Sequence, residues 1–275
     1  MEDYKKRIAK SFDNKSASYD KYSVVQKEVA KRLLERIKYL KCSPLNILDI
    51  GSGTGYLSEQ LKSNFTQANI FCLDISEKML IKCKSKDPTV YAICADTELL
   101  PLKSSSFDLI VSSFTFQWCK DLKKVFSDIK KLLTKKGIFI FSTVGPDTLI
   151  EVKNIFKKID DNQHVNDFLD MHIFGDLLLS LNFSDPVMDV ERLTIEYKSF
   201  DSLLKALRGT GTNVVMSDIK KPIDAKIISK VKQLYQKKSG GGLFPVTYEV
   251  IYAIAWNNFL ENPIKNKKVV EIKKL

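Results

Sequence analysis

The 275-residue sequence predicts an α/β fold, a doubly wound and mostly parallel sheet of seven strands covered by helices. Three observations support this prediction. Short apolar runs alternate with amphipathic helical segments, the runs are apolar on both faces, and a glycine-rich turn follows the first run. Strands that are apolar on both faces are typical of parallel sheets whose crossover helices cover them.

The chain is expected to begin with an N-terminal helical cap, residues 1–43, in which apolar side chains recur at helical spacing. Pro44 ends this pattern, and residues 44–198 are expected to form the core of the sheet. Its strands are predicted at residues 46–50, 69–74, 89–94, 107–114, 138–143 and around 193–197. Its helices are predicted at residues 54–63, after Ser76 as N-cap, at 121–133 with Gly137 closing the helix, and around 177–181.

Residues 199–245 are rich in helix formers and glycine. We expect them to form a lid or substrate-binding insertion at one edge of the sheet, over a ligand cleft. The long apolar run at 246–256 predicts the last strand. Residues 1–262 are therefore expected to form a single domain, followed by a basic tail at 263–275 that lies in solvent.

The composition limits the classes of protein to which this sequence can belong. With 44% hydrophobic and 28% charged residues, the chain can bury a globular core. The sequence contains no run of about 18 apolar residues, so no membrane span is predicted. The first residues lack the apolar stretch of a secretory signal, so we expect a cytoplasmic protein. The five cysteines form no CxxC pair, and we interpret them as small buried residues in a reducing compartment. No metal site is predicted.

The net charge of +11 predicts an acidic partner, which could be nucleic acid, an anionic membrane or an acidic protein. The alternative is a solvated, lysine-rich surface without a partner, because the lysines are spread along the chain.

The most specific signal is the segment ILDIGSGTG at residues 47–55, a glycine-rich turn between a strand and a helix, with Asp49 before the first glycine. Glycines there let the backbone approach a nucleotide-like ligand closely. The spacing GxGxG is shorter than that of the dinucleotide fingerprint, whose third glycine comes one residue later. The shorter turn lacks a pyrophosphate cradle and suits a ligand that carries adenosine and a charged amino acid.

Two further carboxylates follow the second and third predicted strands. Asp74 is placed to accept hydrogen bonds from both ribose hydroxyls, and Ile75 is placed to lie against the adenine. Asp96, next to Thr97, is placed to accept from the adenine amino group. Because ligands of open α/β sheets bind at the carboxyl ends of the strands, these residues and the glycine turn predict one adenosine site.

This set of residues resembles the class I S-adenosylmethionine-dependent methyltransferases, which have a Rossmann-like fold, over about residues 44–145. A closer resemblance, to the malonyl-acyl-carrier-protein O-methyltransferase family of biotin synthesis (BioC), covers most of the chain. It rests on FDNKSASYD at 12–20 with Gln26, LPL at 100–102, FDL at 107–109, FQWC at 116–119, His164 and Asn166, LRGTG at 207–211, and PVTY at 245–248. The chain departs from many relatives at position 52, where it has serine in place of cysteine.

The resemblance implies methyl transfer from S-adenosylmethionine to the free carboxylate of a malonyl thioester on acyl carrier protein. The ester product then starts the synthesis of pimeloyl groups and biotin. A carboxylate is ionised at neutral pH, so the reaction needs no general base. Catalysis is expected to come from holding oxygen, methyl and sulfur in line, since positioning of this kind contributes about 7–11 kcal/mol in oriented intramolecular reactions.

Three residues are the candidates for catalytic roles. Arg208, inside the proposed lid, offers a planar fork that can hold one malonyl oxygen or the thioester carbonyl; the alternative is an exposed arginine stabilised at a helix C-terminus. Tyr19 is expected to fold over the cofactor, the alternative being ordinary aromatic packing. His164 is expected either to line the pocket or to be structural. Trp118 is assigned with the same two alternatives, pocket or core.

The residues expected to contact the cofactor lie in the cap, in the glycine turn and at the ends of the strands. They are Tyr19, Gln26, Asp49, Gly51, Ser52, Gly53, Gly55, Asp74, Ile75, Asp96, Thr97, Ser112 and Phe114.

Acyl carrier proteins are small and acidic, so the resemblance gives the positive charge a partner. We expect a monomer that binds neither nucleic acid nor membrane. Two other enzymatic functions stay open, a small-molecule carboxyl methyltransferase and a tRNA methyltransferase, although no RNA-binding module is visible. A cofactor-binding scaffold without activity is the non-enzymatic alternative.

Overall fold

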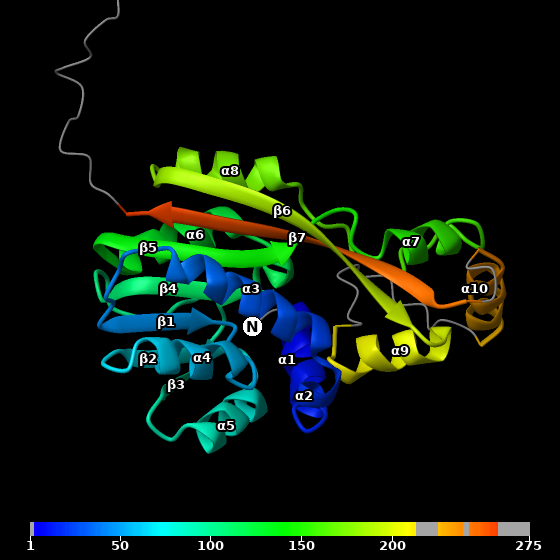
Figure 1. Ribbon diagram of the computed structural model, residues 1–275, viewed down its shortest axis with the longest axis horizontal. Helices are drawn as coiled ribbons and strands as arrows, with labels where there is room; N and C mark the ends of the chain where they lie inside the picture. The colour runs from blue at the N-terminus through cyan, green and yellow to red at the C-terminus, as the bar shows by residue number, and fades with distance from the viewer. Residues whose placement is uncertain (1–2, 213–224, 239–241, 258–275) are drawn as a thin grey trace, which may run out of the picture.

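The computed structural model describes residues 3–212, 225–238 and 242–257 (Figure 1). The strands are β1 (Asn46–Ile50), β2 (Asn69–Asp74), β3 (Tyr91–Cys94), β4 (Phe107–Ser113), β5 (Leu133–Val144), β6 (Ser184–Tyr197) and β7 (Phe244–Trp256). The helices are α1 (Asp3–Lys15), α2 (Tyr19–Tyr22), α3 (Val24–Lys38), α4 (Tyr56–Asn64), α5 (Glu77–Lys86), the 3-10 turn η1 (Phe116–Trp118), α6 (Leu122–Leu132), α7 (Ile150–Phe156), α8 (Met171–Ser180), α9 (Phe200–Gly209) and α10 (Ala225–Lys238).

The described strands form one seven-stranded sheet with the order β3-β2-β1-β4-β5-β7-β6. Strands β1 to β5 run parallel, whereas β7 lies antiparallel between β5 and β6. The prediction of a doubly wound, mostly parallel sheet of seven strands is therefore confirmed.

Helices cover both faces of the sheet, as continuous apolar strands require. On one face α3 and α4 pack through fully buried residues such as Leu33 and Leu61. On the other face α6 and α8 enclose a cluster of aromatic rings that contains Phe126, Phe139 and Phe174. The two helical layers hold the carboxyl ends of β1, β2 and β4 together at one end of the strands, where the glycine turn lies.

The edge strand β3 corrects two expectations. It begins at Tyr91, two residues later than predicted, and its side chains are mostly exposed because β3 has a neighbour on one side only. Cys94 lies on this strand and is exposed, so its interpretation as a buried residue is wrong. Cys72 and Cys83 are buried as expected.

Two strands are longer than the sequence pattern predicted. Gly137 was expected to close a helix, but α6 ends at Leu132 and Gly137 lies within β5, whose first residues follow the helix directly. The strand predicted around residues 193–197 begins at Ser184. As the second edge strand, β6 alternates half-buried and exposed side chains and includes Pro186, so it lacks the apolar run of a central strand.

The insertion after β6 forms α9 and α10, which pack with α7 around the far end of the β6–β7 pair (Figure 1). The buried rings of Phe200, Tyr235 and Phe244 hold this group of helices together. The rest of the predicted insertion, at 213–224 and 239–241, and the basic tail at 263–275 lie outside the described residues. No helix among the described residues is long and apolar enough to cross a membrane.

Candidate active site

The glycine turn after β1 uses its three glycines in different ways. Gly51, Gly53 and Gly55 all have positive φ angles, between 54° and 84°, which disfavour other residues. A Cβ atom on Gly51 would lie 1.9 Å from Thr115 Oγ1, and one on Gly55 would lie 2.5 Å from Cys83 Sγ. A Cβ on Gly53 would meet no atom within 4 Å. Gly51 and Gly55 therefore allow tight packing of the protein, whereas Gly53 leaves open space for a ligand.

Two buried carboxyl groups flank the turn. Asp74 accepts from the backbone N–H groups of Gly53, at 2.9 Å, and Ser76, at 2.8 Å. Burial raises its pKa to about 6, although these hydrogen bonds act in the opposite direction. Asp49 accepts from the Ser58 hydroxyl at 2.5 Å. Burial raises the pKa of Asp49 to about 7 against the effect of Ser58, and the charge of Asp74 adds to the rise.

Polar contacts at three places hold the N-terminal cap over the carboxyl ends of the strands. Near the start of α1, Lys5 forms ion pairs with Asp96, at 3.1 Å, and with Glu98. Near the end of α1, Asp13 accepts from Ser76 Oγ at 2.6 Å and from the N–H of Lys78 at the start of α5. In α2, Asp20 accepts from Thr54 Oγ1 in the glycine turn at 2.5 Å.

Under the cap lie two adjoining pockets, which we call the capped cleft. They enclose about 450 and 400 Å³ and share Tyr19, Gly51, Gly53 and Ser113. The first pocket also includes Ser23, Gln26, Lys27, Ala30, Asp49, Ser52, Thr54, Tyr56 and Leu57. The second also includes Phe12, Asp74, Met79, Phe114, Thr115 and Trp118.

The first pocket contains polar atoms that the protein does not satisfy. Ser23 Oγ, Gln26 Oε1 and Ser52 Oγ are buried, and none has a hydrogen-bond partner among the described residues. Buried polar atoms are normally paired, so three unpaired atoms around one pocket indicate a polar ligand group there.

In the second pocket, burial raises the pKa of the Tyr19 phenol and the charges of Asp74 and Asp20 add to the rise, so the hydroxyl remains protonated.

The structure brings most of the predicted cofactor residues together. Those that line the capped cleft are Tyr19, Gln26, Asp49, Gly51, Ser52, Gly53, Asp74 and Phe114. Phe114 directly follows β4 and has a φ of 55°, an unfavourable conformation for a bulky residue. The hydrogen bond from its backbone N–H to the Ser142 carbonyl helps to hold this conformation.

Other predicted cofactor residues lie beside the capped cleft without lining it. Gly55, Ile75, Asp96 and Thr97 are absent from both walls, and Asp96 is engaged by Lys5. Ser112 is fully buried, and its hydroxyl donates to the Ile50 carbonyl at 2.8 Å. The neighbouring Ser113, which the sequence did not single out, faces both pockets instead.

Two of the three catalytic candidates, His164 and Arg208, do not line the capped cleft. His164 stacks on Phe156 at 4.0 Å between ring centroids and contacts Asp160 at 2.8 Å, which is a structural environment. Arg208 is exposed in the last turn of α9, and its guanidinium has no partner among the described residues. The described residues of the insertion line neither pocket, and its role as a lid over the cleft stays a prediction. The cap covers the cleft.

The insertion instead reaches the cap. Gly209, at the end of α9, lies against the ring of Tyr22, where an added Cβ would come within 2.2 Å of Cδ2. Ser11 Oγ donates to the Gly211 carbonyl at 3.0 Å. The LRGTG segment therefore touches α1 and α2, the elements that carry Phe12 and Tyr19.

Several residues of the cleft were missed or left undecided by sequence reasoning. Trp118 lines the second pocket and meets the Phe12 ring edge-on at 5.9 Å, which decides between pocket and core. Phe12 is the first residue of the FDNKSASYD segment, and that segment could have predicted its place in the cleft. Lys27 and Tyr56 line the first pocket only because α3 packs on α4, and no local pattern marks them. No cluster of metal-binding side chains occurs among the described residues.

Known proteins resemble this chain in sequence and in fold. A family model described as a methyltransferase domain matches residues 48–141. A malonyl-[acyl-carrier protein] O-methyltransferase of Gallionella capsiferriformans is 37% identical over 262 residues, covering 92% of this chain and 90% of that protein. Malonyl-[acyl-carrier protein] O-methyltransferase 1 of Coxiella burnetii is 35% identical, covering 96% of this chain and 92% of that protein.

Solved structures share the fold at low sequence identity. A putative methyltransferase from Bacillus halodurans superposes with a TM-score of 0.61 at 13% identity, covering 84% of this chain and 99% of that one. Phosphoethanolamine N-methyltransferase 2 of Haemonchus contortus, in complex with S-adenosyl-L-methionine, gives 0.55 at 19% identity, covering 88% and 57%. The identity and coverage of the sequence relatives establish that this chain belongs to the malonyl-[acyl-carrier protein] O-methyltransferase family.

Proposed function

We propose that this chain transfers a methyl group from S-adenosylmethionine to the free carboxylate of a malonyl group carried by acyl carrier protein. The observation that carries the proposal is the extent of the likeness. The named relatives match 92% of the chain or more, which includes the cap and the insertion as well as the cofactor-binding residues 48–141. These outer segments meet beside the capped cleft, where an acceptor has to enter.

The residues of the capped cleft fit this cofactor. Asp74 has carboxylate lone pairs left for the ribose hydroxyls, and the open side of Gly53 leaves room beside it. Gln26, Ser23 and Ser52 would hold the charged amino acid end with the polar atoms that the protein leaves unpaired. When bound, S-adenosylmethionine supplies a methyl group already activated by the sulfonium.

The protein's contribution is then positioning and the exclusion of water. A malonyl carboxylate is ionised at neutral pH, so no side chain has to remove a proton. Tyr19 and Phe12 close the cleft from the cap, and Phe114 and Trp118 close it from the end of β4. A neutral Tyr19 hydroxyl can donate a hydrogen bond to a carboxylate at this position.

Arg208 is the proposed anchor for the acceptor. It lies one residue before Gly209, which packs against α2 next to Tyr19. We expect Arg208→Ala to leave cofactor binding unchanged and to abolish turnover, because the guanidinium holds one malonyl oxygen or the thioester carbonyl. Calorimetry with S-adenosylhomocysteine, alongside turnover, checks this. A variant that unfolds and loses cofactor binding would show that Arg208 is structural.

The proposal includes an acidic carrier protein as the partner and a monomeric, cytoplasmic enzyme that binds neither nucleic acid nor membrane.

The test measures transfer of labelled methyl from S-adenosylmethionine to malonyl-acyl carrier protein, malonyl-coenzyme A and bulk tRNA. We expect base-labile label on the malonyl carrier protein, well above the other two acceptors. Equal label on malonyl-coenzyme A would indicate a small-molecule carboxyl methyltransferase, and label on tRNA alone would overturn the proposed substrate.

A further inference from the structure

A second concave surface lies outside the capped cleft, between the first half of α3 and β6. We call it the α3–β6 groove; it encloses about 1180 Å³ of space open to solvent. The residues that matter in it are Lys27, Lys31 and Arg32 on α3, Arg192 and Thr194 on β6, and Tyr56 at the start of α4.

The groove carries an excess of positive charge. Four basic side chains line it against one acidic side chain, that of Glu28. Arg32 and Arg192 are paired with carboxylates. Lys31 is exposed, and Lys27 donates to the carbonyl of Asp20 while lying over the Tyr56 ring. Among the described residues neither lysine forms an ion pair, so both charges remain available to an acidic partner.

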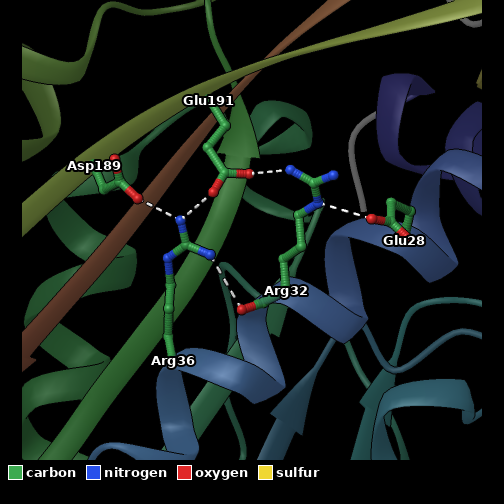
Figure 2. A network of polar contacts seen from close by, with 5 residues as sticks. All are labelled: Glu28, Arg32, Arg36, Asp189 and Glu191. Atoms are coloured by element: carbon green, nitrogen blue, oxygen red, sulfur yellow. Dashed lines mark hydrogen bonds and ion pairs between the residues drawn. The ribbon is translucent and has the colours of Figure 1, made fainter.

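A network of charged residues fixes the two walls of the groove to each other (Figure 2). Glu191 of β6 accepts from Arg32 and from Arg36 of α3, at 2.7 Å in each case. Arg36 also contacts Asp189, and its guanidinium lies 3.7 Å above the Tyr252 ring. The groove is therefore held in shape before any partner arrives, which lowers the entropic cost of binding.

The α3–β6 groove is continuous with the capped cleft. Lys27 and Tyr56 line both the groove and the first pocket, beside the glycine turn. A partner seated in the groove therefore lies beside the capped cleft, and only a slender extension of that partner could enter the cleft. An acidic protein that carries its acyl group on a flexible, phosphate-linked arm has such an extension, and its negative charge complements the positive charge of the groove.

We propose that the α3–β6 groove is the docking surface of the acidic carrier protein, a position that brings its phosphate-linked arm beside the capped cleft. This inference rests on the proposed function, because it assigns a place to that substrate. A protein partner is favoured over RNA because Val24, 61% exposed, and the half-buried Ile195 supply apolar surface among the cations. RNA is bound mainly through phosphate contacts and stacked bases.

The experiment compares wild type with one variant on each wall of the groove, Lys31→Glu and Thr194→Glu. Neither residue lines the capped cleft, and neither change breaks an ion pair. Lys84→Glu is the matched control, because Lys84 is also an exposed helical lysine but lies on α5 outside the groove. Each protein is assayed with malonyl-acyl carrier protein and with malonyl pantetheine, which has neither protein nor phosphate. Binding of the carrier protein itself is measured by calorimetry.

We expect each groove variant to raise the KM for malonyl-acyl carrier protein about five- to tenfold at low ionic strength, with kcat unchanged. Turnover of malonyl pantetheine should not change, Lys84→Glu should match the wild type, and added salt should narrow the difference. Any of three results would overturn the proposal. Lys84→Glu raises the KM as much as the groove variants do, the groove variants impair turnover of both substrates equally, or tRNA competes with the carrier protein in wild type and not in the groove variants.

The two proposals can fail separately. If wild type methylates neither substrate, the proposed function fails, and calorimetry then decides the groove. Weaker binding of the carrier protein by the groove variants alone supports the docking surface, whereas unchanged binding overturns it.

Discussion

At the scale of single residues, the buried carboxyl groups beside the glycine turn combine a structural role with a binding role. Asp74 orders the turn by accepting from Gly53, and the same carboxylate faces the second pocket. Asp49 is deeper and contacts Ser58 of α4. Both have raised pKa values because burial disfavours their charged forms.

Asp74→Ala is expected to weaken binding of S-adenosylmethionine by about 1.5–3 kcal/mol, the range for hydrogen bonds to a charged group. Isothermal calorimetry at pH 8 measures this. Asp74→Asn, which keeps one acceptor, should lose less. Unchanged affinity in the alanine variant would remove Asp74 from the cofactor site.

The pKa of about 6 adds a pH dependence to this binding. A raised folded-state pKa means that Asp74 stabilises the ligand-free fold fully below about pH 4, its unfolded value, and that this contribution is lost as pH rises through 6. Cofactor binding needs the ionised acceptor, so the affinity of wild type should increase between pH 5 and 7. Calorimetry across this range should show the increase in wild type and a flatter profile in Asp74→Asn.

Gly51 and Gly53 should respond differently to the same substitution. Gly51→Ala places a Cβ 1.9 Å from Thr115 Oγ1 and should lower the free energy of unfolding by several kcal/mol. Gly53→Ala meets only the backbone penalty of positive φ, about 1–2 kcal/mol, yet should weaken cofactor binding at least tenfold. Urea unfolding and calorimetry on both variants separate the two effects. Full cofactor affinity in Gly53→Ala would mean that the open side of Gly53 does not face the ligand.

At the scale of elements, the contact between α2 and α9 links the acceptor side of the molecule to the cofactor side. The cap closes the cleft through Tyr19, and the insertion supports the cap through Gly209 and Gly211. Arg208 is therefore close to the cleft in the fold although it does not line it.

Gly209→Ala is expected to push α9 away from α2, because its Cβ would lie 2.2 Å from the Tyr22 ring. The KM for the malonyl acceptor should rise more than the Kd for the cofactor, since the residues that hold the cofactor are not displaced directly. Steady-state kinetics and calorimetry test this. Adding Tyr22→Ala should restore space and recover part of the KM; failure to recover would place the cause elsewhere.

At the scale of the whole molecule, the charged network of Figure 2 joins residues about 150 positions apart in the chain and ties the cap to the last edge strand. Burial alone would raise the pKa of Glu191, but hydrogen bonds and charge from Arg36 and Arg32 bring it below its ordinary value.

Glu191→Ala is expected to lower the free energy of unfolding by about 0.5–2 kcal/mol at pH 7, because two partly exposed pairs are lost. A lowered pKa means that this contribution is present above the ordinary glutamate value and lost as pH falls through the folded-state value. The difference from wild type should therefore shrink in acid. Asp189→Ala should lower the free energy of unfolding by less, because Asp189 is one partner of Arg36 only and is more exposed than Glu191. Urea titrations of both variants at two pH values measure these differences.

The sequence by itself determined the parts of this protein whose signals are local. The apolar runs gave the strands of the sheet, and the segment from Asp49 to Gly55, followed by Asp74, gave the cofactor end of the site. These are properties of a strand, its turn and the next helix, so a short stretch of sequence specifies them.

Only the tertiary structure decided which side chains meet. It assigned Asp96 to Lys5, turned Ser113 and not Ser112 toward the cleft, placed His164 against Phe156, and formed the α3–β6 groove from segments far apart in the chain. The physical reason is that such contacts depend on how helices pack on the sheet and on which strands lie at its edges. No spacing within a single segment contains that information.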